Sequence, residues 1–261
     1  LLLKTTIYTK PNQMSINTLT KVFKETSEYQ ELIKKISSNK RNVQVQIIDE
    51  AVPYIIASLR EDIETPMLII CHSPEQSRRM QERITAWSDQ TTITSRFPEN
   101  DSLPFERMVS NLDVSRERLC VLDSILHGDN PPTIVASATA LSQTTLSKEI
   151  FQRSTHSIEQ GADISLDQIT FEWQKMGYQF EPNVYSPGFA SRRGGILDIF
   201  PMGAEYPFRI ELWGDRIESI RKFDPATQRS LEEVDSFRVI PAAETLPDFY
   251  DNEEINRLFS H

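Results

Sequence analysis

Side chains suited to binding gather in one stretch of the chain, residues 188–215, which is GFASRRGGILDIFPMGAEYPFRIELWGD. They are Arg192, Arg193, Arg209, Glu211 and Trp213. Arginine presents a planar fork of donors that can pair with a carboxylate through two hydrogen bonds, so it suits ion pairs at interfaces better than lysine does. Interfaces also favour arginine together with aromatic side chains. The chemistry that these residues predict is recognition of another molecule.

The alternation of residues 208–213 predicts a half-buried strand, because successive side chains of a strand point to opposite faces. Arg209, Glu211 and Trp213 then share one face, and the apolar residues between them share the other. We expect the apolar set to bury against a helix at 166–176. A second interpretation stays open here: charged outer faces are common on antiparallel sheets, and Arg209 and Glu211 then form only weak local ion pairs.

A phosphate-binding loop is missing from the first half of the chain. Such a loop needs glycines, so that backbone N–H groups can surround the phosphates, and a lysine to reach them. All eight glycines lie at Gly128 or later, and residues 49–53, which follow an expected strand at 43–48, are DEAVP. Asp49 and Glu50 resemble a magnesium-binding pair after a strand, but acids at a helix start are the simpler interpretation. We therefore expect no nucleotide cofactor and no catalytic residues.

Composition limits the remaining classes. The 261 residues suit two domains, and the formal net charge of -10 disfavours general binding to nucleic acid. Cys71 and Cys120 are far apart and predict buried thiols in a reducing cytoplasm, with no metal site. No apolar run is long enough to span a membrane, and the start does not resemble a signal peptide. The chain begins without Met, from which we expect a fragment of a longer protein.

Strands and helices alternate in the first half. We expect helices at 15–38 and 51–60, a helix that begins at Ser73, one capped by Asp113 and a further start at 138–141. The expected strands are 43–48, 67–71, 91–97 and 133–137. This alternation predicts an α/β domain with a mostly parallel sheet. The residues between 97 and 113 predict a surface loop.

The pattern changes after residue 150. One helix, capped by Ser165 and ended by Gly177, is followed by strands at 178–185, 195–200, 208–213, 217–223 and 237–240. A helix followed by sequential strands predicts a small α+β domain with an antiparallel sheet. The expected domains are therefore 1–148 and 149–243, and residues 244–261 begin a further, truncated element.

Three strings carry a resemblance to a known family: FPENDSLPFERMVSNLDVSRERL, TIVASATAL and ASRRGGILDIFPMGAEYPFRIELWGDRIESIRKFDPATQRSLEEV. They resemble the amino-terminal region of bacterial transcription-repair coupling factor, which is itself similar to the front of the excision-repair protein UvrB. The resemblance covers most of the chain from about residue 40. It implies a degenerate, RecA-like helicase domain without a phosphate-binding loop, followed by a domain that docks UvrA.

The resemblance also implies the partners. UvrA would bind this region directly, whereas RNA polymerase and DNA would be contacted only by other domains, among them an ATP-dependent motor. The carboxy-terminal domain of the same protein would mask the docking surface. The chain would then be a non-catalytic, cytoplasmic adaptor that recruits nucleotide excision repair to stalled RNA polymerase. The rival functions are a UvrB-like ATP-dependent helicase, which the missing phosphate loop disfavours, and direct DNA binding by the first domain.

The resemblance assigns roles to particular residues. Arg193 matches the family arginine before the glycine step, and Arg209 with Glu211 matches the R-x-E of the next strand. Arg192 is an additional charge where the family usually has a neutral residue. We expect Arg193→Glu or Arg209→Glu to abolish UvrA binding at nearly unchanged thermal stability, because exposed charges contribute little to folding. Ile210→Asp should instead unfold the second domain.

Overall fold

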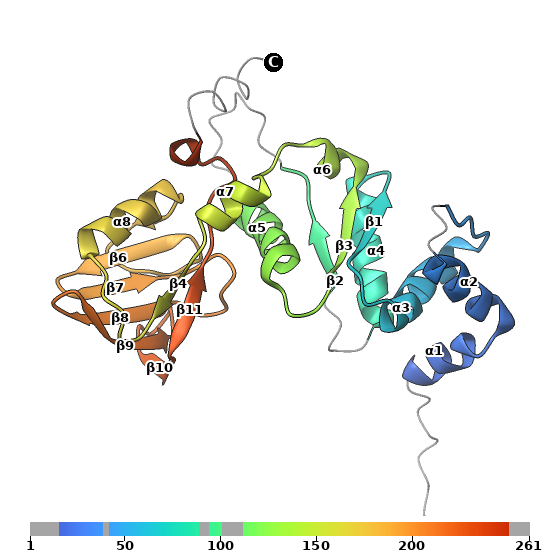
Figure 1. Ribbon diagram of the computed structural model, residues 1–261, viewed down its shortest axis with the longest axis horizontal. Helices are drawn as coiled ribbons and strands as arrows, with labels where there is room; N and C mark the ends of the chain where they lie inside the picture. Colours follow the sequence, from blue (N-terminus) through green and yellow to red (C-terminus); the bar gives the residue numbers. More distant parts are fainter. Residues whose placement is uncertain (1–15, 39–41, 89–93, 101–111, 251–261) are drawn as a thin grey trace, which may run out of the picture.

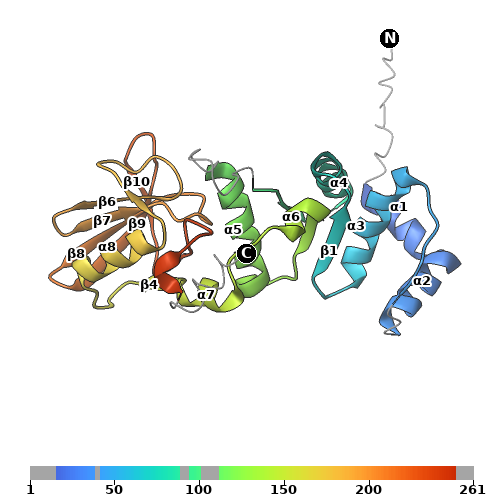
Figure 2. The ribbon, with the colours of Figure 1, turned by 90° about the horizontal axis from the view of Figure 1, so that it is seen from above.

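The computed structural model describes residues 16–38, 42–88, 94–100 and 112–250. Its elements lie in three groups along one axis: small helices at the amino-terminal side, a parallel sheet in the middle and a larger sheet on the far side (Figures 1 and 2). Within the described ranges, no helix is both long and apolar enough to cross a membrane.

The amino-terminal group is helical. It contains α1 (Ile16–Lys24), α2 (Ser27–Ser37), the short 3-10 helix η1 (Asp49–Ala51) and α3 (Val52–Asp62). The single helix expected at 15–38 is wrong in its described part, because the chain breaks at Thr26. The Thr26 hydroxyl accepts the Tyr29 backbone N–H at 3.3 Å and donates to the Phe23 carbonyl at 2.7 Å, so it starts a new helix.

The strand expected at 43–48 is also wrong. These residues have no regular backbone hydrogen bonding, and Ile48 is 70% exposed. Alternation alone does not make a strand, because strand stability depends on a neighbouring strand. Val45 and Ile47 instead line a hollow beside Tyr29 of α2.

The middle group is a parallel sheet between two helices (Figure 1). Its elements are β1 (Met67–Cys71), α4 (Pro74–Trp87), β2 (Thr94–Phe97), α5 (Leu112–His127), β3 (Thr133–Ser137) and α6 (Ala138–Ser142). The strand order is β1-β3-β2, and both pairs are parallel. The predicted helix start is confirmed, since the Ser73 hydroxyl accepts the Gln76 N–H at 3.3 Å. Residues 101–111 of the expected loop lie outside the described ranges.

The last group is built around six strands. Its helical elements are α7 (Lys148–Arg153), α8 (Leu166–Lys175) and the 3-10 helix η2 (Pro247–Phe249). Its strands are β4 (His156–Glu159), β5 (Gln179–Phe180), β6 (Phe189–Arg193), β7 (Ile196–Ile199), β8 (Phe208–Trp213), β9 (Arg216–Phe223), β10 (Ser230–Glu233) and β11 (Ser236–Val239). The sheet order is β10-β9-β8-β7-β6-β5, and β4 pairs separately with β11.

The predicted fold class is confirmed: a parallel α/β sheet is followed by a mostly antiparallel one. The expected strand at 178–185 shrinks to β5, which pairs in parallel with β6. Pro182 offers no backbone N–H to a ladder just beyond β5, which explains the early end. Strands β4, β6 and β10 were not expected from the sequence.

The core of the large sheet lies on the face that α8 covers. Leu197, Ile210 and Ile220 are fully buried there and belong to one cluster with Ile169 and Trp173 of α8. The prediction that the apolar side chains of 208–213 bury against the helix at 166–176 is therefore confirmed. β8 thus has one face committed to the core and one turned away from α8.

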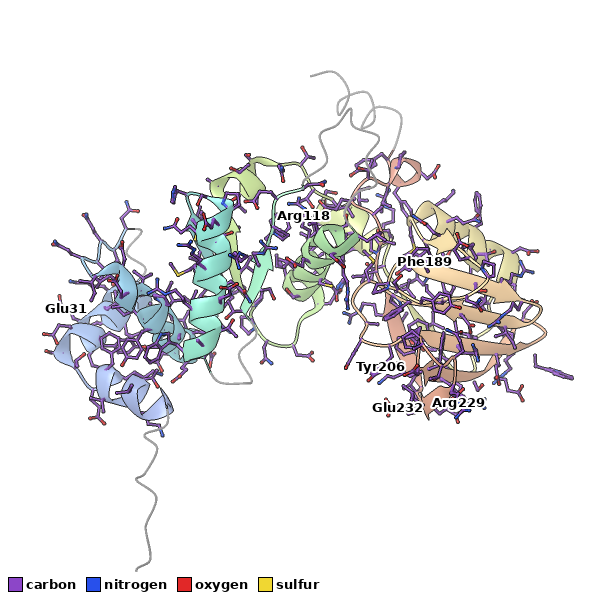
Figure 3. The ribbon with its side chains drawn as sticks, turned by 180° about the vertical axis from the view of Figure 1, so that it is seen from behind. Glu31, Arg118, Phe189, Tyr206, Arg229 and Glu232 are labelled. Carbon is purple, nitrogen blue, oxygen red and sulfur yellow. The ribbon has the colours of Figure 1, made fainter. Side chains whose placement is uncertain are left out.

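The same cluster continues into the middle group through Leu119, Leu146 and Phe151. Arg118 of α5, which Figure 3 labels, is fully buried and contacts Glu244 twice, from Nε at 2.5 Å and from Nη2 at 2.9 Å. The predicted domain limits at 148 and 243 stay predictions, and this core runs across both. The described part of 244–261 packs back onto the protein, with Leu246 fully buried.

Candidate functional site

The pairing of β7, β8 and β9 brings charged residues together on the sheet face away from α8, here called the outer face. Its charged and polar members include Arg193, Asp198, Arg209, Glu211, Ser219 and Arg221. Asp198 is the register partner of Arg209, and Arg209 is the partner of Arg221. Two residues further along β8, Glu211 is the register partner of Ser219 on β9. Alternation therefore places these side chains on one surface.

A buried carboxylate lies at the centre of the outer face. Asp198 is 1% exposed, and Arg209 donates to it twice, from Nε to Oδ1 at 2.7 Å and from Nη2 to Oδ2 at 2.9 Å. Arg193 donates from Nη2 to the same Oδ2 at 2.7 Å. The hydrogen bond to Asp198 raises the pKa of Arg209, against the opposing effect of burial. The two predicted docking arginines thus share one acid that the sequence interpretation did not include.

The expectation that Arg209 is an exposed charge is wrong. Its side chain is 18% exposed, and its guanidinium lies 4.7 Å from the ring centroid of Phe223. Phe223 belongs to a small second cluster with Val184 and Phe200. Arg193 differs, because half of its side chain is exposed. Arg193 is therefore the more accessible arginine of the pair.

Glu211 lies beside a second arginine that was not predicted. Its Oε2 accepts the Ser219 hydroxyl at 3.0 Å, and its Oε1 lies 3.3 Å from Nη1 of Arg221. Arg209 and Arg221 stand directly opposite each other, an arrangement that would repel without nearby acids. Asp198 and Glu211 supply those acids, so the outer face carries an alternating pattern of charge.

Arg192 does not join this face. Its register partner is the buried Leu197, so it lies on the side of the sheet that α8 covers. There its Nη1 contacts Asp167 of α8 at 2.5 Å. Arg192 was predicted to bind UvrA together with Arg193, but the two side chains lie on opposite sides of the sheet, because consecutive strand residues point to opposite faces.

Trp213 stands apart at the end of the β8–β9 hairpin. It is 81% exposed and lies beyond a register shift between Glu211 and Leu212. It lies four positions along the strand from Arg209, which is about 13 Å of rise. Beside it is an open hollow of about 650 Å³ that Arg216 and Asp235 also line. Trp213 could anchor a partner only if the contact reached from the outer face to the hairpin.

The carboxyl edge of the parallel sheet is where an α/β fold usually binds ligands. The turn from β1 to α4 consists only of His72 and Ser73, so it holds no phosphate loop. At the end of β3, the Ser137 hydroxyl donates to the carboxylate of Glu99. A carboxylate at this position would repel a phosphate. The first strand-to-helix turn of this sheet is thus at 72–73, whereas the sequence interpretation looked for a phosphate loop after the expected strand at 43–48.

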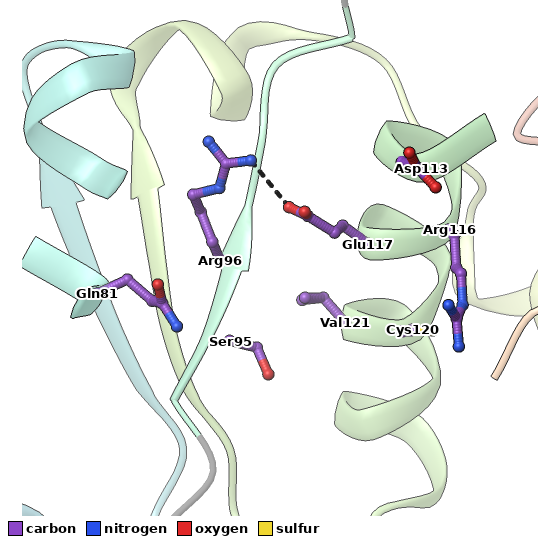
Figure 4. Close-up of a pocket in the computed structure, with 8 residues that line it drawn as sticks. All are labelled: Gln81, Ser95, Arg96, Asp113, Arg116, Glu117, Cys120 and Val121. Carbon is purple, nitrogen blue, oxygen red and sulfur yellow. Dashed lines mark hydrogen bonds and ion pairs between the residues drawn. The ribbon is translucent and has the colours of Figure 1, made fainter. Parts of the chain in front are cut away.

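A hollow of about 550 Å³ lies between β2 and α5 (Figure 4). Arg96 and Glu117 pair across it at 3.0 Å. Arg116 donates to the backbone carbonyls of Met202 at 2.9 Å and Ala204 at 3.0 Å, so its charge serves the contact with the large sheet. The lining of this hollow carries positive and negative side chains, and both of its arginines already have partners, so it offers no cluster of free cations for a phosphate.

The two cysteines and His156 have structural surroundings. Burial raises the pKa of the Cys71 and Cys120 thiols, which disfavours the reactive thiolate. His156 Nε2 accepts the Trp173 indole N–H at 2.9 Å, and burial lowers the pKa of the imidazole. Across the residues that the structure describes, no three His, Cys, Asp or Glu side chains gather as metal ligands.

The strands that form the outer face lie within a region that matches a known protein family. Residues 157–244 match the family model of the UvrB interaction domain, and this range holds β6 to β9. The transcription-repair-coupling factor of Bacillus subtilis (strain 168) is 28% identical over 224 residues, which are 85% of this chain and 19% of that protein. Those of Escherichia coli (strain K12) and Myxococcus xanthus are 27% identical over 195 residues and 33% identical over 151 residues. These matches cover 73% and 58% of this chain, and 16% and 13% of the two relatives.

The resemblance expected from the sequence is confirmed: the chain is related to transcription-repair-coupling factors and contains a region that matches the UvrB interaction domain. The chain spans a fifth or less of the length of these relatives. The matched family is named for an interaction and not for a reaction.

Proposed function

We propose that this chain is a non-catalytic adaptor module that binds UvrA through the outer face of its large sheet. The observation that carries the proposal is the Arg193–Asp198–Arg209 cluster, which lies within the match to the UvrB interaction domain. The proposed role is to bring nucleotide excision repair to stalled RNA polymerase, in the cytoplasm, where both processes take place.

The chemistry of the outer face supports this proposal. Arg193 is half exposed and keeps donors beyond the one that contacts Asp198, so it can pair with a carboxylate on a partner. Glu211 and Arg221 are each about one third exposed and offer both charges beside it. Alternating charges favour one orientation of a partner and disfavour others, because a wrong placement brings like charges together.

The remaining partners are proposed for other parts of a longer protein. RNA polymerase and DNA would be bound there, and a carboxy-terminal domain would cover the outer face until UvrA is needed. The module itself would need no cofactor. These proposals rest on the relatedness to transcription-repair-coupling factors, of which this chain spans only a small share.

The test is UvrA binding by this chain, measured by calorimetry and by co-elution. Arg193→Glu should weaken binding by at least about tenfold, the size expected for a residue that carries much of an interface. Arg192→Glu is the matched control, since it makes the same charge change at the adjacent residue on the opposite face. Binding by Arg193→Glu at wild-type strength would contradict the site, and no UvrA binding by the wild type would contradict the function.

A UvrB-like, ATP-dependent helicase remains the second candidate, because the β1-β3-β2 sheet with flanking helices is the type of fold that binds nucleotides. The two-residue turn after β1 and Glu99 beside Ser137 disfavour it. Titration of the chain with ATP and Mg²⁺ decides between the two: saturable binding would support the second candidate and contradict the adaptor without a cofactor.

A further inference from the structure

Asp198 is the only charged residue in β7, whose other residues are Ile196, Leu197 and Ile199. A buried carboxylate is costly unless donors surround it, and a well-packed apolar side chain often stabilises a fold as well or better. Asp198 nevertheless occupies the centre of the outer face with 1% exposure. Its presence there therefore calls for a role besides folding.

We propose, on the basis of the UvrA-binding function above, that Asp198 is the positioning residue of the docking face and holds Arg193, beside Arg209, in the orientation that a partner recognises. Both carboxylate oxygens take part. Oδ1 accepts Nε of Arg209, and Oδ2 accepts Nη2 of Arg209 and Nη2 of Arg193. One acid on β7 thus fixes arginines from the two neighbouring strands, β6 and β8.

Arg209 and Arg193 differ in the number of contacts that fix their side chains. Arg209 is held on three sides: its fork pairs twice with Asp198, its plane lies over Phe223, and its Nη1 is 3.5 Å from the Gln228 carbonyl. Arg193 is held through Nη2 alone and remains half exposed. Asp198 therefore limits the rotamers of Arg193 while its other donors stay accessible to a partner.

The expected effect on binding follows from the cost of ordering a long side chain. Immobilising one flexible side chain at an interface costs up to about tenfold in affinity, and a side chain that is already held does not incur that cost. Without Asp198, Arg193 and Arg209 would also lose the acid that both contact and that compensates their two positive charges. Arg193 would then move away from the cluster and lose the bound orientation.

The experiment uses the whole chain and UvrA at 10 °C, with folding confirmed by circular dichroism. Asp198→Asn keeps the shape of the side chain and removes its charge, and we expect it to weaken UvrA binding about tenfold. Asp167→Asn is the control, because it also removes an acid paired with an arginine, but on the face that α8 covers. That control should bind UvrA as the wild type does.

The Arg193→Ala background separates positioning from a merely structural role. If Asp198 acts through Arg193, adding Asp198→Asn to Arg193→Ala should cost less than about twofold more, since coupled residues are not additive. Full multiplication of the two losses would overturn the proposal, as would wild-type affinity in Asp198→Asn. If Asp198→Asn does not fold, Asp198→Glu replaces it. This variant keeps the charge and displaces the carboxylate by one methylene, with the same loss expected.

A measurement without UvrA keeps the two proposals distinguishable. The Nε–Hε order parameter of Arg193, from ¹⁵N relaxation, should fall in Asp198→Asn and stay unchanged in Asp167→Asn. Absence of UvrA binding by the wild type would refute the proposed function, and the order parameter would then still decide whether Asp198 positions Arg193. An unchanged order parameter would overturn the positioning role.

Discussion

The replacement of Arg209 by Gln is expected to destabilise the protein by about 2 kcal/mol, although Arg209 is a candidate binding residue. Removing one partner of a fully buried ion pair costs about 3–5 kcal/mol, because the other charge stays buried without compensation. Two features reduce this cost here. Arg209 is 18% exposed, so water can reach the site, and Arg193 remains bound to the Asp198 carboxylate.

Arg193→Gln provides the comparison within the same cluster. Arg193 makes one hydrogen bond to Asp198 and is half exposed, whereas Arg209 makes two and contacts Phe223. Exposed ion pairs contribute at most about 1 kcal/mol. We therefore expect Arg193→Gln to lower the free energy of unfolding by about 1 kcal/mol or less. The less exposed arginine, Arg209, should give the larger loss of stability.

Urea unfolding and thermal unfolding, both followed by circular dichroism, measure the difference in free energy and in Tm, with Arg192→Gln as the control on the other face of β6. Since about 1 kcal/mol corresponds to roughly 2–4 °C in a chain of this size, Arg209→Gln should lower Tm by about 4–8 °C. If the two variants prove equally stable to within about 0.5 kcal/mol, the size of error expected in such comparisons, the assigned roles of the two pairs are wrong.

Three further predictions concern the core, the pH dependence of stability and the ion pair between Arg118 and Glu244. Ile210→Asp should unfold the large sheet, seen as loss of near-ultraviolet circular dichroism, because Ile210 is fully buried. His156 has a lowered pKa and must be neutral to accept the Trp173 N–H, so its stabilisation is complete above about pH 6.5 and decreases as the pH falls below it. His156→Gln should remove that part of the pH dependence in urea titrations. Arg118→Leu should cost about 3 kcal/mol, since it leaves the 9%-exposed side chain of Glu244 without its arginine.

The sequence pattern predicted the inner face of the large sheet well. Phe208 and Ile210 are buried and Leu212 is partly buried, as the alternation of 208–213 requires, and α8 begins after the Ser165 cap. These features are local, because strand parity and helix capping involve neighbouring residues. The same parity argument applied to residues 192 and 193 would have separated the two arginines. Their opposite directions could have been predicted once a strand was assigned to 189–193.

The outer face could be predicted only in part, because it depends on register between strands. Asp198 meets Arg209 through the pairing of β7 with β8, and Arg221 joins through the pairing of β8 with β9. No short-range pattern contains that information. One signal was present: an acid within the apolar run ILDIF requires buried donors, and arginines are the natural donors in this stretch.

The wrong prediction of a strand at 43–48 has the same cause, since a strand depends on pairing with a neighbour that is distant in sequence. Its alternation satisfied the requirement within the segment, but no described strand pairs with it. The positions of the domain boundaries likewise depend on contacts between distant residues, such as Arg118 and Glu244, which are 126 positions apart. Such contacts are invisible to patterns that span a few residues.

The geometry of β8 has a consequence for how binding and folding are related in this protein. If the two faces of the sheet were independent, every outer-face variant would affect the proposed UvrA binding alone. Arg209 variants should affect both properties, since Arg209 pairs with the buried Asp198 and packs over the Phe223 ring. Arg193 preserves the separation, because half of its side chain is exposed and only one hydrogen bond holds it. A loss of UvrA binding in an Arg209 variant is therefore ambiguous by itself, whereas the same loss in a folded Arg193 variant identifies the docking face.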